Sequence, residues 1–329
     1  MQALYPLSNA VRKDQCAVYC QRINLIPNSL IANIKQTILL QNDMSKTNAI
    51  IPKILNIINI LLLSAPLLAH ASLPQASSVP GGVAIVALGK VLHQANKPQA
   101  WLGEQAVLVT ADKKKWYAVV GLPLDIKPGS HELNIKFGDE TRAQTFEVKS
   151  KAYPEQHITL QDKGKVELSP EDEARAVREI ATIKELKLHW RNEEKTDLAF
   201  MIPAKGRLSG NFGLRRFFNG EPRSPHAGLD VAVARGTPIK ASAQGTVLAV
   251  DDYFFNGKTI FVDHGNGLIT MYCHLDQSEV RSGDSVSKGQ QLGLSGMSGR
   301  ATGPHLHWSV ILNGAMVDPA LFIPARHLR

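Results

Sequence analysis

Thr246–Tyr272 reads TVLAVDDYFFNGKTIFVDHGNGLITMY, and this stretch decides the fold of the C-terminal part of the chain. In this stretch, apolar β runs alternate with short polar segments, and the same pattern begins at Met201. The β runs are Thr246–Val250, Thr259–Val262, Leu268–Tyr272 and His305–Leu312. The glycines that recur upstream are Gly206, Gly210, Gly213, Gly220, Gly228, Gly236 and Gly245. Short β runs bounded by turn residues predict an antiparallel β domain with many tight turns over residues 200–325.

A second group of short β runs lies upstream, over residues 80–150. The runs are Val83–Leu88, Ala106–Thr110, Trp116–Val120, Glu132–Phe137 and Thr145–Val148. Turn signals such as Pro128-Gly129 and Gly138-Asp139 separate them, and a linker rich in Pro, Ser and Gly, Leu73–Gly82, precedes them. Several short strands at this spacing predict a small β-sandwich as the N-terminal domain, so we expect a mainly β protein.

Between the two β regions, residues 165–195 are predicted to form a linking helix. Ser169 suits the N-cap, Pro170 suits the first helical position, and the acidic Glu171-Asp172 suits the first turn. The residues that then follow at helical spacing are Val177, Ile180, Ala181, Lys184 and Leu188. This stripe predicts a helix that packs one face between the domains, and a plain spacer is the alternative.

The first 71 residues are set apart by an apolar run, Ile54–Ala69. Lys46 and Lys53 precede this run, and Ala69-His70-Ala71 follows it. A charged start, a short apolar run and a small-residue exit are the three parts of a secretory signal peptide. Because the run is short for a membrane span, we expect cleavage after Ala71, and an uncleaved N-terminal anchor is the alternative.

The stretch before this signal, Met1–Asp43, is assigned no function. Met44 would begin a signal peptide of ordinary proportions, so we expect translation to start there, and a disordered leader is the alternative. Cys16 and Cys20 lie in this stretch, which leaves Cys273 as the one cysteine of the mature chain. The mature chain therefore forms no intramolecular disulfide, and no cysteine follows the apolar run directly, as a lipid-anchored protein would require.

Composition and charge narrow the class of protein. Hydrophobic residues make up 44% and charged residues 20% of the 329 residues, which is ordinary for a globular chain of about two domains. The formal net charge is +8, and residues 1–71 hold six basic and two acidic residues, so the mature chain carries only +4. This weak positive charge suits an anionic cell envelope and argues against a nucleic-acid-binding protein.

Three clusters of polar residues carry the candidate chemistry, and all lie in the C-terminal β region. They are His226 with Asp230, His274, and His305 with His307. Residues two apart in a strand face the same side, so His305 and His307 can share a metal, or one can bind metal while the other serves the substrate. His226 and Asp230 can converge along a strand or through a glycine-bent loop. Two imidazoles and a carboxylate leave a fourth position open, as in a catalytic zinc site.

These residues stand in motifs that resemble the LytM/lysostaphin-type zinc peptidases, the M23 metallopeptidases, over roughly residues 200–320. The motifs are Ser209–Arg215 (SGNFGLR), Pro225–Asp230 (PHAGLD), Gly236–Ile239 (GTPI), Tyr272–Leu275 (YCHL) and Gly299–Trp308 (GRATGPHLHW). Residues 80–190 more loosely resemble an N-terminal domain that accompanies some exported bacterial members. The resemblance therefore implies an antiparallel-β peptidase domain behind a small β domain and a linking helix.

The resemblance also implies a role for each residue of the constellation. His226, Asp230 and His307 would be the ligands of one Zn²⁺ ion, and His274 and His305 would be the catalytic histidines. Each of these two histidines either accepts a proton from water or hydrogen-bonds the developing oxyanion, and the assignment between them stays open. Cys273 departs from the varied, often small or apolar residue that is expected before the catalytic histidine.

The implied reaction is hydrolysis of peptide cross-links in bacterial peptidoglycan, so the expected partners are peptidoglycan peptide stems. With the signal peptide, we expect the periplasm of a Gram-negative bacterium and a D-alanyl–diaminopimelate bond, and membrane anchoring only if the signal segment stays uncleaved. The alternative is a catalytically silent LytM-type regulator of other wall hydrolases, which the complete ligand set disfavours. A structural, adhesin-like β protein would leave five matched side chains unexplained.

Overall fold

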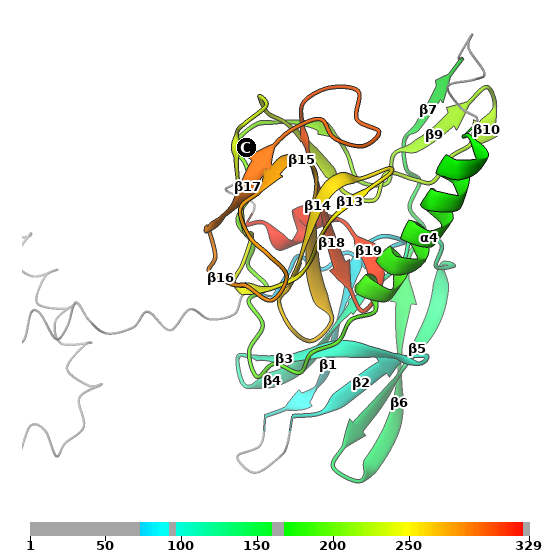
Figure 1. The fold of residues 1–329 in the computed structure, drawn as a ribbon. Helices are drawn as coiled ribbons and strands as arrows, with labels where there is room; N and C mark the ends of the chain where they lie inside the picture. Colours follow the sequence, from blue (N-terminus) through cyan, green and yellow to red (C-terminus); the bar gives the residue numbers. More distant parts are fainter. Residues whose placement is uncertain (1–72, 92–96, 160–167, 325–329) are drawn as a thin grey trace, which may run out of the picture. The chain divides into compact units, whose positions relative to one another are not determined.

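The computed structural model describes residues 73–91, 97–159 and 168–324. The predicted leader, signal peptide and cleavage site lie outside the described residues and stay predictions. Within the described ranges, no helix is long and apolar enough to cross a membrane. The described chain is mainly β, with an N-terminal β region, a helix and a C-terminal region of antiparallel strands, as the sequence predicts (Figure 1).

Six N-terminal strands form one antiparallel sheet in the order β1-β4-β3-β2-β5-β6. They are β1 Val83–Lys90, β2 Gln99–Leu102, β3 Gln105–Asp112, β4 Lys115–Gly121, β5 Gly129–Phe137 and β6 Glu140–Val148. All five predicted β runs lie inside these strands, whereas β2, with four residues, is too short to show periodicity in the sequence. Strands from both ends of this order share one hydrophobic core, which accounts for the sandwich-like character.

Strands β3 and β4 bury both of their faces. In β3, Val107 and Val109 belong to the N-terminal core, whereas Leu108 between them packs in the core of the C-terminal region. In β4, Val119 likewise packs in the C-terminal core while its neighbours Ala118 and Val120 pack in the N-terminal one. Since side chains alternate across a strand, a continuous apolar run contributes residues to two cores, one on each face. The N-terminal sheet therefore packs directly on the C-terminal region.

The C-terminal region is built on a large antiparallel sheet with the path β16-β13-β14-β15-β18-β11-β8. Its strands are β8 Arg207–Gly210, β11 Leu229–Ala232, β12 Pro238–Lys240, β13 Gly245–Tyr253, β14 Gly257–Asp263, β15 Leu268–Ser278, β16 Ser285–Val286, β17 Gln291–Ser295, β18 Leu306–Leu312 and β19 Ala315–Val317. A separate small sheet joins β7 Glu155–Ile158, β9 Arg215–Phe218 and β10 Glu221–Pro222, and a 3₁₀ helix, η2 Pro319–Phe322, follows β19.

The helix between the β regions is α4, Pro170–Lys187. Ser169 is its N-cap and its hydroxyl accepts the backbone N–H of Asp172, as expected. The predicted packing face is wrong, because Val177 and Ile180 are 62% and 56% exposed.

The side chains of α4 that pack are instead Ile183 and Leu186, which lie against the hydrophobic cluster of the large sheet that includes Phe261 and Met271. Figure 1 shows α4 running alongside that sheet. The stripe read from the sequence lies on a different side of the helix from Ile183 and Leu186, because α4 is polar overall and its few apolar residues do not define one face.

Candidate active site

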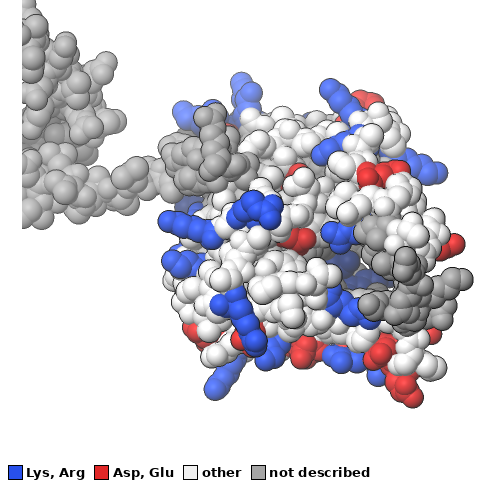
Figure 2. Space-filling model, turned by 90° about the horizontal axis from the view of Figure 1, so that it is seen from above, with Lys and Arg blue, Asp and Glu red and all other residues white. Residues whose placement is uncertain are grey.

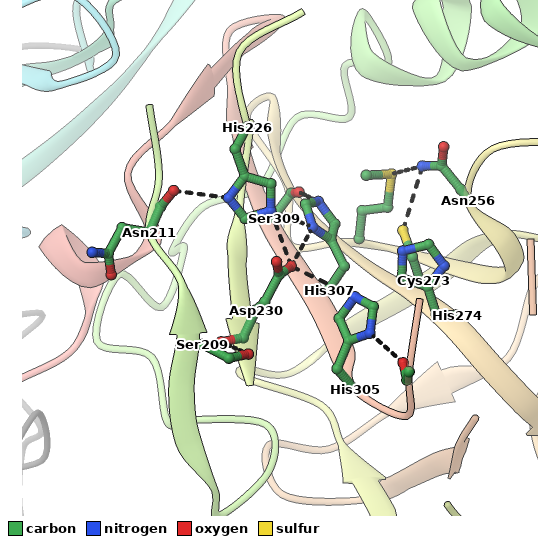
Figure 3. A network of polar contacts seen from close by, with 12 residues as sticks. Ser209, Asn211, His226, Asp230, Asn256, Cys273, His274, His305, His307 and Ser309 are labelled. Atoms are coloured by element: carbon green, nitrogen blue, oxygen red, sulfur yellow. Dashed lines mark hydrogen bonds and ion pairs between the residues drawn. The ribbon is translucent and has the colours of Figure 1, made fainter. Parts of the chain in front are cut away.

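Three donor side chains converge on one face of the large sheet, beside β11 and β18. Nε2 of His226 lies 3.0 Å from Oδ1 of Asp230, and Nδ1 of His307 lies 2.9 Å from the same oxygen. The two imidazole nitrogens are 3.0 Å apart. Figure 3 shows the three side chains turned toward one another, His226 and Asp230 from one segment and His307 from a strand that is distant in the sequence. The structure therefore brings together the three residues that sequence analysis singled out as metal ligands.

Strand register accounts for two of these donors. Asp230 on β11 is the direct cross-strand partner of His307 on β18, so their side chains lie on one face of the sheet. Leu306 and Trp308, the neighbours of His307 in β18, point into the core on the other face. His226 comes from the loop before β11, and its backbone is held by hydrogen bonds with Gly213 and Leu214. Of the two routes open from sequence, the loop therefore brings His226 to Asp230.

The close approach of these segments needs a residue without a side chain beside Asp230. A Cβ atom at Gly210 would lie 2.2 Å from Oδ2 and 2.8 Å from Cγ of Asp230. Gly210 is also the cross-strand partner of Asp230 in β8. Any side chain at this position would push the carboxylate away from the two imidazoles, so a glycine is required by space.

Outer hydrogen bonds orient the two imidazoles. Nδ1 of His226 donates to the backbone carbonyl of Asn211 at 2.8 Å, because a carbonyl only accepts. Nε2 of His307 lies 2.9 Å from the hydroxyl of Ser309, which can accept its proton. With a ring proton between them, each contact with Asp230 is a hydrogen bond that favours the charged carboxylate. With both rings neutral, three electron-pair donors face one another. This arrangement is repulsive by itself, and a cation between the donors relieves the repulsion.

The carboxylate of Asp230 is held in its charged form. Burial alone would raise its pKa, but the contacts with His226 and His307 outweigh burial and hold the pKa well below its usual range. Burial lowers the pKa of His307, which favours the neutral ring. A charged carboxylate and neutral imidazoles are the protonation states that a metal ion binds.

The donor set fits a zinc ion. In a tetrahedral site with ligand distances of about 2.0–2.1 Å, neighbouring ligand atoms are about 3.3 Å apart. The three distances here are 2.9, 3.0 and 3.0 Å, so a small expansion accommodates the ion. The three residues also line an open cleft, which leaves a fourth position accessible to a reactant.

His274 reaches the cleft from β15 through a strained and irregular piece of backbone. Cys273 and His274 together stand opposite the single residue Thr259 of β14, which makes a β-bulge. His274 has a φ of +60°, a backbone conformation that residues other than glycine rarely adopt. Its backbone N–H donates to the carbonyl of Asn256. The bulge turns His274 into the cleft, and no sequence pattern indicated it.

His274 and His305 lie beside the donor triad, and each ring donates from its Nδ1 to a backbone carbonyl. Nδ1 of His274 donates to the carbonyl of Ser298 at 2.9 Å, and Nδ1 of His305 donates to the carbonyl of Gly303 at 2.8 Å. Nε2 of His305 is 3.8 Å from Oδ1 of Asp230, and the rings of His274 and His305 have centroids 4.7 Å apart. Burial lowers the pKa of His274 to about 4, so its Nε2 is a proton acceptor at neutral pH.

All five histidine and aspartate side chains line one cleft of about 900 Å³. This volume lies in the range of about 300–1,000 Å³ that is usual for ligand sites. A triad that can hold a metal ion, with two further imidazoles beside it in a cleft of this size, can bind a peptide, polarise its carbonyl and move a proton.

Comparison with known proteins assigns the family. The model of peptidase family M23 matches residues 224–319, and that of the peptidase family M23 N-terminal domain matches residues 76–151. A solved structure from Pseudomonas aeruginosa, described as a peptidase M23, is 42% identical with a TM-score of 0.63, over 75% of this chain and 95% of that one. The chain belongs to peptidase family M23.

The curated relatives of this M23 chain match it over only part of their length. Peptidoglycan DD-endopeptidase ShyA of Vibrio cholerae is 40% identical over 120 residues, which are 36% of this chain and 28% of ShyA. Peptidoglycan DD-endopeptidase ShyC of the same bacterium is 39% identical over 115 residues, or 34% of this chain and 26% of ShyC. The chain thus spans less than a third of either relative, so the activity in their names does not transfer by similarity alone.

Sequence analysis of this M23 chain missed the groups that orient the site. Ser309 follows His307 by two residues in β18, so strand alternation was a signal that could have found it. The carbonyls of Asn211, Ser298 and Gly303 carry no signal, because every residue has one.

Cys273, the one departure from the family pattern, is fully buried behind the site. The side-chain amide of Asn256 contacts its sulfur at 3.4 Å, and burial raises the pKa of Cys273 to about 12. A protonated, buried thiol is a poor metal ligand and a poor nucleophile, so Cys273 acts as a small apolar residue here.

Proposed function

We propose that the chain is a zinc-dependent endopeptidase that hydrolyses peptide cross-links of bacterial peptidoglycan. Membership in peptidase family M23 and the names of the ShyA and ShyC relatives support this substrate class. The observation that carries the proposal is the convergence of one donor atom each from His226, Asp230 and His307, at distances of 2.9 to 3.0 Å from one another.

The proposed ligands are His226, Asp230 and His307, which would hold one zinc ion. Such an ion supplies a Lewis acid for the scissile carbonyl and lowers the pKa of water toward about 7. The Nε2 atom of either His274 or His305 would accept the proton of the attacking water and pass it to the leaving amine, while the other ring, when protonated, would hydrogen-bond the oxyanion. The carbonyls of Ser298 and Gly303 hold both rings in position while the charge on them changes.

The proposed location is the periplasm of a Gram-negative bacterium, which follows from the signal-peptide pattern that ends at Ala71. There the substrate bond would be the D-alanyl–diaminopimelate cross-link. Protein recovered from the cell envelope is then expected to begin at Ser72, as read by mass spectrometry of its N-terminal peptide. An N-terminus at or before Met44 on the recovered protein would contradict cleavage.

Metal analysis together with digestion of purified sacculi tests the activity. The full chain is expected to carry about one zinc per molecule and to release uncross-linked muropeptides, identified by mass. His307→Ala is expected to lose the zinc and more than about a hundredfold in rate, because two donors hold the ion far more weakly.

His131→Ala, the same substitution at a half-buried position of β5 that does not line the cleft, is the matched control and is expected to keep wild-type zinc content and rate. Full activity of zinc-free protein would overturn the proposal. Zinc binding without cleavage, together with stimulation of another wall hydrolase, would favour the silent regulator instead.

A further inference from the structure

Helix α4 supplies one wall of the cleft that holds the candidate site. Ile180, Ile183, Lys184 and Lys187 line the same space as the donor triad. The helix lies in the interval between the two matched family models, which end at residue 151 and begin at residue 224. Family membership therefore assigns no role to this wall.

The helix is held firmly against the turn between β13 and β14. A carboxylate oxygen of Glu179 accepts the backbone N–H of Phe254 at 2.6 Å, and the guanidinium of Arg175 donates to the carbonyl of Asp252 at 2.9 Å. Ile183 also packs on the large sheet. Because these polar and apolar contacts fix α4 in place, its other cleft-lining side chains stand at defined positions.

The charged side chains that line the cleft are mostly basic. They are Lys184, Lys187, Arg216 and Arg300, against the single carboxylate of Asp230, which is engaged by two histidines. Figure 2 shows a hollow right of centre on one face with blue lysine and arginine side chains at its border. A cleft with this excess of positive charge attracts anionic ligands.

Two of these cations have no counterion within the part of the chain that the structure describes. Lys184 and Lys187 make no ion pair there, whereas Arg175 on the same helix pairs with Glu179. They stand one turn apart, where like charges repel. Burial lowers the pKa of Lys187, and the charge of Lys184 lowers it further. A bound anion would relieve both the repulsion and the desolvation.

We propose that Lys184 and Lys187 form a carboxylate-binding subsite that selects acidic peptides, an inference that rests on the proposed endopeptidase function. The neighbouring Ile180 and Phe255 line the same cleft and are 56% and 41% exposed. They would cover the aliphatic part of the residue that carries the carboxylate. That carboxylate belongs either to a side chain or to the C-terminus of a peptide stem.

Binding of uncleavable stem peptides to the full chain tests the subsite by calorimetry, independently of hydrolysis. The reference ligand is an alternating L/D tetrapeptide that contains diaminopimelate and ends in a free carboxylate. Two further ligands replace either the diaminopimelate carboxylate or the C-terminal carboxylate by a carboxamide. The wild-type chain is expected to bind one of the two carboxamides about tenfold more weakly, and this ligand identifies the carboxylate that is recognised.

The variant Lys184→Gln/Lys187→Gln is expected to bind the reference ligand about tenfold more weakly than the wild type does. For the carboxamide that the wild type binds weakly, the affinities of variant and wild type are expected to be equal. Lys184→Arg/Lys187→Arg keeps both charges and is expected to stay within about threefold of wild type. Lys136→Gln/Lys149→Gln removes the same charge from exposed positions of the N-terminal region and is expected to change nothing.

A wild-type chain that binds all three peptides equally, or none of them, overturns the subsite. So does an equal loss in the Lys136/Lys149 control, which would show a general charge effect. If the double glutamine variant unfolds, the single variants are measured, and unchanged affinity in both overturns the subsite as well. Failure of the endopeptidase proposal is detected separately, as intact sacculi in the digestion.

Discussion

At the scale of single residues, the candidate site depends on backbone segments that approach one another without intervening side chains. A Cβ at Gly228 would lie 2.6 Å from both the carbonyl oxygen of Trp308 and the hydroxyl of Ser309, and 2.7 Å from Nε2 of His307. The backbone oxygen belongs to a central strand and cannot move away cheaply. Gly228 thus lets the loop that carries His226 lie flat on β18.

We therefore expect Gly228→Ala to weaken zinc binding by about tenfold to a hundredfold, because the added methyl group displaces His307 from Ser309 or shifts the loop that holds His226. A competition titration with a zinc chelator measures the effect. Gly303→Ala is the matched control, since its Cβ would meet nothing within 4 Å and its φ is not positive. Equal zinc affinity of Gly228→Ala and wild type would show that the close approach is not required.

At the scale of elements, strand register, one β-bulge and one helix together position the side chains of the site. Strands β11 and β18 place Asp230 beside His307, and the bulge in β15 turns His274 to the same side. Helix α4 forms one wall of the cleft, and its attachment to the sheet depends on few contacts. Glu179 is the central one, because it joins Arg175 within the helix to the backbone N–H of Phe254.

Glu179→Ala is expected to destabilise the chain by about 1–2 kcal/mol, because a charge-assisted hydrogen bond is lost and a backbone N–H is left without a partner. Urea unfolding measures the free energy, and hydrogen exchange is expected to show faster opening of α4. Glu185→Ala makes the same change at an exposed position of the same helix and is expected to cost less than about 0.5 kcal/mol. Similar losses for the two variants would contradict the role of Glu179.

At the scale of the whole described molecule, the N-terminal sheet is joined to the C-terminal region through buried contacts. The side chain of Asn313 accepts the backbone N–H of Gly121 at 2.6 Å and donates to its carbonyl at 3.0 Å. A Cβ at Gly121 would lie 2.4 Å from the carbonyl oxygen of Leu312, so β4 meets the end of β18 at backbone distance. The N-terminal sheet is thereby a fixed part of the fold that surrounds the site.

Asn313→Gly is expected to destabilise the chain by about 2–4 kcal/mol, because both polar groups of Gly121 stay buried without partners. Glycine keeps the positive φ of 43° at this position, so backbone strain does not confuse the result. Asn219→Gly, at a φ of 52° in an exposed turn, is the control and is expected to change stability little. Chemical denaturation of both variants gives the comparison, and equal stability would show that the Asn313 contact is unimportant.

Much of the fold and of the candidate site was predictable because it rests on local patterns. Alternating and apolar runs marked the strands, Ser169-Pro170 marked the start of α4, and the spacing of His305 and His307 placed both on one face. The packing face of α4 was not predictable, because the large sheet selects Ile183 and Leu186 by position rather than by the stripe that contains Val177.

The amino-acid sequence by itself determined which chemistry is available to this protein: two imidazoles and a carboxylate for a metal, two further histidines, and a β scaffold to carry them. Only the tertiary structure decided how these groups meet. Asp230 and His307 are 77 residues apart and become neighbours through strand pairing, while His274 is aimed by a bulge. The basic wall of the cleft also exists only in the fold, since long-range packing, and not local propensity, sets α4 beside the site.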